Sequence, residues 1–164
     1  MSTVAAPERG ARACVSCRLA RDARELAAHH DIRRAVFVDE QGLFAGDDRD
    51  GRDAAPATLH AVGALDGRIA GAVRLFPCDA DGLRWRGDRL AVLPAARHTS
   101  LGAALVRFAV ATAGTAGGER MDAMIQLPNV RFFALLGWAP DGAVTRYHGR
   151  LHRPMAIALT RPDR

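Results

Sequence analysis

The segment LAVLPAARHTSLGAAL, residues 90–105, contains the end of a strand, a polar turn and the start of a helix. The first backbone N–H groups of a helix have no partner within it, and the helix dipole favours negative charge there. Gly102 lets a ligand approach these amides, and Arg97 adds a positive charge. The segment therefore predicts an anion site. The alternative is an ordinary turn in which Thr99 or Ser100 caps the helix.

Upstream of this segment, two apolar runs that alternate with a period of two are joined by Asp66-Gly67. Asp-Gly between such runs predicts an antiparallel hairpin with a two-residue turn. Apolar residues at helical spacing predict helices over residues 20–38 and from about residue 101. The other expected elements are strands at 13–19, 83–93, 121–127, 143–147 and 155–160, a helix at 130–136 and a connection at 149–154. This order predicts a mixed α/β domain whose mostly antiparallel sheet has about six to seven strands flanked by helices.

The composition is that of a globular protein, with 164 residues of which 49% are hydrophobic and 25% charged. That length corresponds to about one domain, expected over residues 12–164 after a flexible tail at 1–11. The chain has no apolar run of about 18 residues, which argues against a membrane span. Charged residues near the N-terminus stand where a signal peptide needs an apolar core, so we expect a cytoplasmic protein.

All 23 basic residues are arginines, and the formal net charge is +5. Arginines spread along the whole chain are typical of a solvated surface, so we expect neither nucleic-acid nor membrane partners. The three cysteines include a Cys14-x-x-Cys17 pair, for which structural, metal-binding and redox roles all remain open. No second pair of ligands stands at a spacing typical of structural zinc, and we expect no metal.

The segment at 97–102, Arg-His-Thr-Ser-Leu-Gly, resembles the coenzyme A pyrophosphate loop of the GNAT superfamily of N-acetyltransferases, which reads Arg/Gln-x-x-Gly-x-Gly/Ala. Ser100 replaces the first glycine of that pattern. Residues 32–41 resemble the R-x-x-V-F-x-x-E-Q signature of a subset of these enzymes, and residues 147–155 resemble its G-x-x-H-x-x-M ending. The first half of the chain, including residues 71–75, is also similar to acyl-homoserine-lactone synthases, which share the fold.

The resemblance implies a GNAT-like acyl-CoA N-acyltransferase fold. Acetyl-CoA, or another acyl-CoA, would lie where the strand ending at Val92 splays from the strand at 121–127. The resemblance implies the following cofactor-binding residues: Val92, Arg97, His98, Thr99, Ser100, Leu101, Gly102, Ala103 and Asn129.

Transfer to an amine needs a base that takes a proton from the acceptor. Glu40, Asp50 and His152 are the candidates. Their alternative roles are a helix-terminal charge, a turn former and a loop hydrogen-bond partner. Arg74, expected to face outward from its strand, could clamp an acceptor carboxylate, with a surface ion pair as the alternative. Phe133 stands where many family members carry the tyrosine that protonates the leaving thiolate.

The resemblance implies acetyl transfer to the amine of a small metabolite or an amino-acid-like acceptor. A non-catalytic acyl-CoA-binding protein is one alternative, favoured by Phe133. An enzyme of the acyl-homoserine-lactone-synthase type is another, disfavoured by the intact loop at 97–102. A homodimer is left open.

Overall fold

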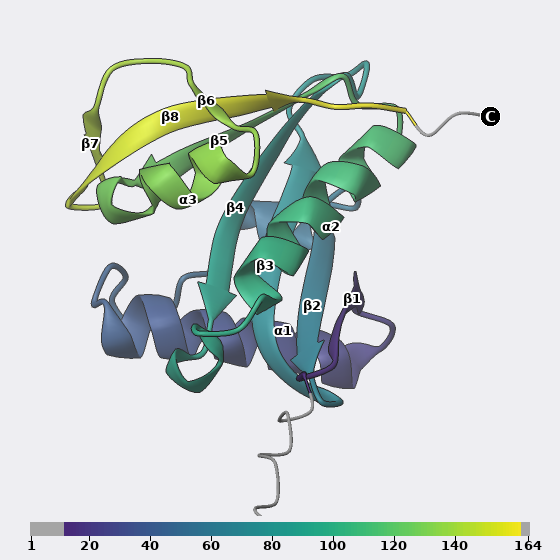
Figure 1. Ribbon diagram of the computed structural model, residues 1–164, viewed down its shortest axis with the longest axis vertical. Coiled ribbons are helices and arrows are strands. Elements are labelled where there is room, and N and C mark those ends of the chain that lie inside the picture. The colour runs from purple at the N-terminus through teal and green to yellow at the C-terminus, as the bar shows by residue number, and fades with distance from the viewer. Residues whose placement is uncertain (1–11, 162–164) are drawn as a thin grey trace, which may run out of the picture.

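The computed structural model describes residues 12–161 (Figure 1). They contain an eight-stranded sheet in the order β1-β2-β3-β4-β5-β8-β6, with β7 paired to β8. The strands are β1 (Val15–Leu19), β2 (Leu59–Leu65), β3 (Arg68–Pro77), β4 (Arg84–Val92), β5 (Arg120–Gln126), β6 (Ala139–Pro140), β7 (Thr145–Tyr147) and β8 (Arg150–Ala158). Every pairing is antiparallel except that of β4 with β5. The predicted mixed, mostly antiparallel sheet is confirmed, with eight strands instead of six or seven. The expected tail at 1–11 lies outside the described residues.

The helix predicted over residues 20–38 is present, but it begins at Ala23 and continues as a π-helix to Glu40. The helical segments are α1 (Ala23–Arg33), the π-helix η1 (Arg34–Glu40), the 3₁₀ segments η2 (Gly51–Ala54), η3 (Pro94–Ala96) and η4 (Leu127–Asn129), α2 (Leu101–Thr115) and α3 (Val130–Leu135). Asp22 caps α1, because its side chain accepts the N–H of Glu25 at 2.8 Å. Across residues 12–161, no helix has both the length and the apolar character that a membrane crossing requires.

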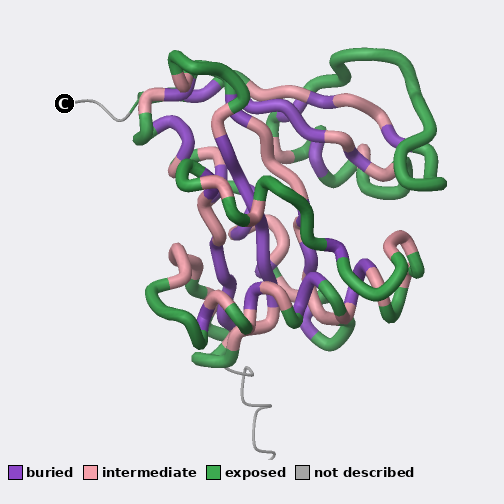
Figure 2. The backbone as a smooth tube through the Cα atoms, turned by 180° about the vertical axis from the view of Figure 1, so that it is seen from behind, coloured by how far each residue is buried: buried purple, intermediate pink, exposed green. Residues whose placement is uncertain are grey.

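The two long helical segments cover opposite faces of the sheet (Figures 1 and 2). Buried residues of α2 pack with β2, β3 and β5 in one apolar cluster, and those of α1 and η1 pack with β3 and β4 in another. Gly63 and Gly71 permit the close approach of α2. A Cβ on Gly63 would lie 2.8 Å from Leu101 Cδ1, and one on Gly71 would lie 2.6 Å from Leu105 Cδ1. These glycines therefore fix the position of the first turn of α2 against the sheet.

The predicted hairpin is confirmed, with φ values of 50° at Asp66 and 82° at Gly67, as a two-residue turn of positive φ requires. The connection expected at 149–154 is wrong, because β8 already begins at Arg150. Pro154 lies within that strand, opposite Met124 of β5. Although proline lacks an N–H donor, its carbonyl oxygen accepts the N–H of Asp141 at 2.8 Å, so the strand continues through it.

The parallel pairing of β4 with β5 is short. It joins Arg84–Arg86 to Arg120–Asp122, and beyond these residues the two strands diverge (Figure 1). Arg89 in β4 has a φ of 53°, and the register of β4 against β3 shifts in this region. The irregular strand and its early separation from β5 split the sheet.

Candidate active site

A cavity lies in the split between β4 and β5 and is lined from both faces of the sheet. Phe37 of η1 and the nearby Phe44 line it on one face. Val106 and Ala109 of α2 line it on the other. The further lining residues are Gln41, Leu43, Val73, Arg86, Gly87, Asp88, Arg89, Leu90, Met121, Ala123, Met124, Ile125, Gln126, Asn129, Phe133, Trp138, Tyr147, His148 and His152. The cavity therefore connects the two sides of the sheet.

The N-terminus of α2 leaves several backbone donors free. Thr99 Oγ1 donates to the carbonyl oxygen of Ala96 at 2.6 Å and accepts the N–H of Leu101 at 3.3 Å. Ser100, at the N-cap position, makes no side-chain cap. Within residues 12–161, no acceptor is found for the amides of His98, Ser100, Gly102 and Ala103. Thr99 thus provides part of the cap expected as the alternative, while four donors remain for an anion.

Gly102 lies between the end of β4 and helix α3. A Cβ added to it would meet Phe132 Cζ and Val92 Cγ2, each at 3.8 Å. An alanine fits at that distance, whereas a larger side chain would extend between the two elements. Of the residues expected to bind the cofactor, Asn129, just before α3, lines the cavity, whereas Val92 and residues 97–103 do not.

Glu40 and Arg97, expected to have separate roles, form an ion pair with each other. Arg97 Nη1 donates to Glu40 Oε2 at 2.6 Å, and Arg97 Nε donates to the carbonyl oxygen of Val92 at 3.0 Å. Both side chains are exposed, and the hydrogen bond from Arg97 lowers the pKa of Glu40. Neither residue lines the cavity, so the structure does not bring Glu40 to a position from which it contacts a substrate there.

His152, in β8, is buried and lines the cavity. Its Nδ1 lies 2.8 Å from the carbonyl oxygen of Arg150, which can only accept, so Nδ1 carries the proton. Nε2 of the neutral ring is then unprotonated, and no described residue forms a hydrogen bond with it. The ring of Tyr147 lies against that of His152, with centroids 5.3 Å apart. This pair provides a proton acceptor and a phenol on one wall.

The acidic loop between η1 and β2 is bound by buried arginines. Arg33, fully buried in α1, donates from Nε to Asp48 Oδ2 at 2.7 Å and from Nη1 to Asp53 Oδ1 at 2.6 Å. Arg89 donates to Asp48 Oδ2 at 3.1 Å and to the carbonyl oxygen of Asp48. The loop is therefore fixed to α1 and to the sheet by paired, hydrogen-bonded charges.

The expectation that Arg74 faces outward is wrong, because its side chain is only 1% exposed. It donates to Asp50 Oδ1 at 2.6 Å, to Asp53 Oδ2 at 2.9 Å and to Asp88 Oδ2 at 2.7 Å. The acidic loop covers β3 at this position. The guanidinium of Arg74 is bonded to three carboxylates and is not available to bind the carboxylate of an acceptor. Asp50 is likewise held by Arg74 and does not line the cavity.

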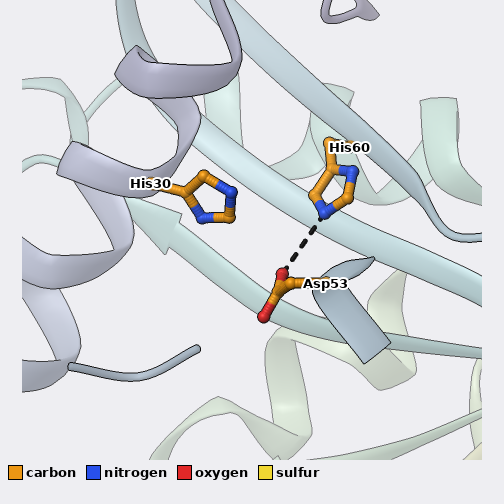
Figure 3. Close-up of side chains that lie close together, drawn as sticks. All are labelled: His30, Asp53 and His60. Atoms are coloured by element: carbon orange, nitrogen blue, oxygen red, sulfur yellow. Dashed lines mark hydrogen bonds and ion pairs between the residues drawn. The ribbon is translucent and has the colours of Figure 1, made fainter. Parts of the chain in front are cut away.

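His30, Asp53 and His60 lie together beside this loop, with one ligand atom from each within 4.8 Å of the others (Figure 3). His60 Nε2 lies 3.2 Å from Asp53 Oδ1. These side chains are of the types that zinc prefers. However, both Asp53 oxygens already accept from Arg33 and Arg74, whose positive charges oppose a second cation. Sequence reasoning missed this cluster because its members come from α1, the acidic loop and β2.

The comparisons with known proteins identify the class of this fold and site. The sequence profile of the Acetyltransferase (GNAT) family matches residues 24–138, and the chain belongs to that family. It is thus an acyltransferase of a family that uses acyl-CoA. No curated protein matches the chain.

Three solved structures illustrate the similarity. A protein from Lactobacillus plantarum thought to be an N-acetyltransferase is 25% identical, with a TM-score of 0.78 over 88% of this chain and 98% of that one. An acyl-CoA N-acyltransferase from Pseudomonas aeruginosa is 24% identical, with a TM-score of 0.74 and the same coverage. The CoA-dependent acyl-homoserine lactone synthase BjaI is 18% identical, with a TM-score of 0.72 over 91% of this chain and 84% of that one. The fold and both expected resemblances are therefore confirmed.

Proposed function

We propose that this protein transfers an acyl group from acyl-CoA to the amine of a small metabolite in the cavity between β4 and β5. One observation carries the proposal: free amides gather at the α2 N-terminus, beside Val92 at the end of β4, and the cavity that β4 lines crosses the sheet and presents His152. The family supports the reaction class, and the acceptor and the residue roles are our inference.

The residues present fit coenzyme A. The amides from His98 to Ala103 and the Arg97 side chain would hold the pyrophosphate, since helix N-termini bind phosphates through free N–H groups. Residues 87–90 of β4 are not paired with β5, so their backbone is available to the amides of the pantetheine arm. When bound, acyl-CoA supplies a thioester whose carbonyl carbon is attacked by the amine. Glu40 competes with the pyrophosphate for Arg97.

His152 is our candidate base. Its Nε2 lone pair can accept a proton from the acceptor amine, directly or through one water, while Nδ1–H stays bonded to the carbonyl oxygen of Arg150. Phe133 is buried and has no proton to donate. Tyr147, the chain's one tyrosine, lies beside His152 and is our candidate donor to the leaving thiolate.

The charges of Arg74 and of the acidic loop are paired with one another. Arg74 is bound by three aspartates, and Asp48 and Asp50 are bound by arginines, so none of these three charges remains free for an acceptor. The acceptor end of the cavity instead offers Gln41 and Gln126, which are hydrogen-bonded to each other at 3.1 Å. We therefore propose a small amine, without requiring that it also carry a carboxylate.

Thiol release from acetyl-CoA across a panel of small amines tests the proposal. We expect His152→Gln to lower kcat by about 100-fold or more, the usual contribution of a positioned base, while coenzyme A binding is unchanged. Turnover at the wild-type rate in His152→Gln would contradict the role of His152. Binding of coenzyme A without turnover of any amine would favour the non-catalytic alternative, for which Phe133 is the structural argument.

A further inference from the structure

We infer that the cavity accepts acyl groups longer than acetyl, with an aliphatic chain of about four to six carbons lying on the α2 side of the split. The inference rests on the proposed function, because it assigns the acyl end of the same site.

The α2 side of the cavity is built from apolar side chains. Its residues belong to the larger apolar cluster of the fold, and they are Leu90, Val106, Ala109, Met121, Ala123, Phe133 and Trp138. Of the charged β4 residues that line the cavity, Asp88 and Arg89 are bonded to Arg74 and to the acidic loop, whereas the buried Nε of Arg86 has no hydrogen-bond partner among the described residues. A hydrocarbon chain on the α2 side therefore meets mostly carbon, and the buried Nε1 of Trp138 is the one side-chain nitrogen of that set of residues.

The cavity is too large for an acetyl group alone. Its volume is about 150 Å³, and an apolar cavity of about that volume in another protein holds a benzene molecule. The thioester and the acceptor amine share this volume, and the methyl of an acetyl group would still leave much of the apolar wall on the α2 side uncovered, which forfeits contacts that a longer chain would make. About six carbons is the corresponding upper limit.

The entrance to this space depends on a glycine. Gly87 stands one residue beyond the last β4 residue paired with β5, and a Cβ there would lie 3.3 Å from Met121 Sδ. Phe133 and Trp138 are both buried, and their rings stack edge to face with centroids 5.4 Å apart. The acyl chain would therefore enter past Gly87 and lie against Met121 and this aromatic pair.

Binding of a series of acyl-CoA molecules to the full chain tests the inference without relying on turnover. Calorimetry or thermal stability would compare free coenzyme A with its acetyl, butyryl, hexanoyl and decanoyl thioesters. Burial of each methylene should tighten binding about fourfold up to the hexanoyl group, with no further gain for decanoyl. Acetyl-CoA binding as tightly as hexanoyl-CoA would overturn the inference while leaving the proposed function intact. Failure of all five to bind would overturn both.

Two variants of α2 locate the acyl site. Ala109→Phe fills the apolar side of the cavity and should reduce hexanoyl-CoA affinity to that of acetyl-CoA, whose own affinity changes little. Ala111→Phe, the same change on the exposed side of the helix, should retain the wild-type preference. If Ala109→Phe does not fold, Gly87→Ala provides the same test, because the added methyl narrows the entrance against the flexible end of Met121. Unchanged chain-length preference in the folded variant would contradict the inference.

Discussion

Two sets of arginine–carboxylate contacts in this molecule differ in burial. Under the acidic loop, Arg33 and Arg74 are at most 1% exposed, and each is bound by at least two aspartates. At the start of α2, Arg97 and Glu40 are 39% and 37% exposed and have one carboxylate between them. Both sets pair a guanidinium with carboxylates, but only the pair at the start of α2 is exposed to solvent.

The difference in burial indicates that the buried pairs are structural, whereas the Arg97–Glu40 pair can exchange its partner for a ligand. Removing one partner of a buried pair leaves an uncompensated charge away from water, whereas an exposed pair is screened and contributes little. The buried contacts therefore hold the loop that closes one side of the cavity. The exposed pair can open, which is what an arginine needs if it is to bind a phosphate.

The largest expected effect comes from breaking the buried set. Arg33→Ala would leave Asp48 and Asp53 without a shared partner and should lower the free energy of unfolding by about 3–5 kcal/mol. Urea denaturation followed by circular dichroism measures this. A loss below about 1 kcal/mol, the value for a surface pair, would contradict the comparison.

Acid should weaken the same region. His29 donates from Nδ1 to the carbonyl oxygen of Ala61 and accepts from Arg33 at Nε2, so the ring is held neutral. Burial lowers the pKa of His29 to about 3, against about 6.5 in an unfolded chain. The unfolded chain then binds the extra proton, so stability is full above pH 6.5 and falls as the pH decreases toward 3. From His29 alone, the loss between pH 7 and pH 4 should be about 3 kcal/mol.

Denaturation curves at several pH values, for wild type and His29→Asn, measure this dependence. The variant should be less stable at pH 7 but should lose less stability on acidification. Equal losses in the two proteins would show that His29 does not couple folding to pH.

Breaking the exposed set should affect binding more than stability. Arg97→Ala would remove the charge-assisted hydrogen bond that we propose to the pyrophosphate, and we expect coenzyme A affinity to fall about 10- to 100-fold. Arg107→Ala, an exposed arginine of the same region that does not line the cavity, is the matched control and should bind normally. Calorimetric titration measures the coenzyme A affinity of both variants and of the wild type. A similar loss of affinity in both variants would indicate that arginines act only through the overall positive charge of the protein.

The smallest effect should come from changing Glu40, the partner of Arg97 in the exposed pair. Glu40→Gln should change the free energy of unfolding by less than about 1 kcal/mol. It should also tighten coenzyme A binding a few fold, because Arg97 is then released and a negative charge is removed. Weaker binding in Glu40→Gln would show that Glu40 supports the cofactor site and does not compete with it.

Local patterns predicted the parts of this molecule that are local in origin. The Asp66-Gly67 hairpin and the start of α2 depend on a few neighbouring residues, and both were predicted from them. Arg74 alternates with apolar neighbours in β3 and so resembles an outward-facing residue. The loop that buries it is more than 20 residues earlier in the chain. The sequence pattern of the strand does not predict that a distant loop buries Arg74.

The site shows the same limit. Residues 97–102 stand out in the sequence because they are contiguous. The cavity depends on β4 and β5 parting after three paired residues, which is a tertiary property. Tyr147 falls at the edge of the segment 147–155, and its contact with the His152 ring depends on the pairing of β7 with β8.

The measurement that tests the account most directly is the affinity of coenzyme A for the wild-type protein and two variants of Gly102. Gly102→Ala adds a methyl with ordinary contacts at 3.8 Å and should bind like wild type. Gly102→Trp would fill the space between Val92 and Phe132 and should abolish binding while the protein remains folded. That pattern would locate the cofactor at the start of α2. Wild-type affinity in a folded Gly102→Trp variant would contradict it.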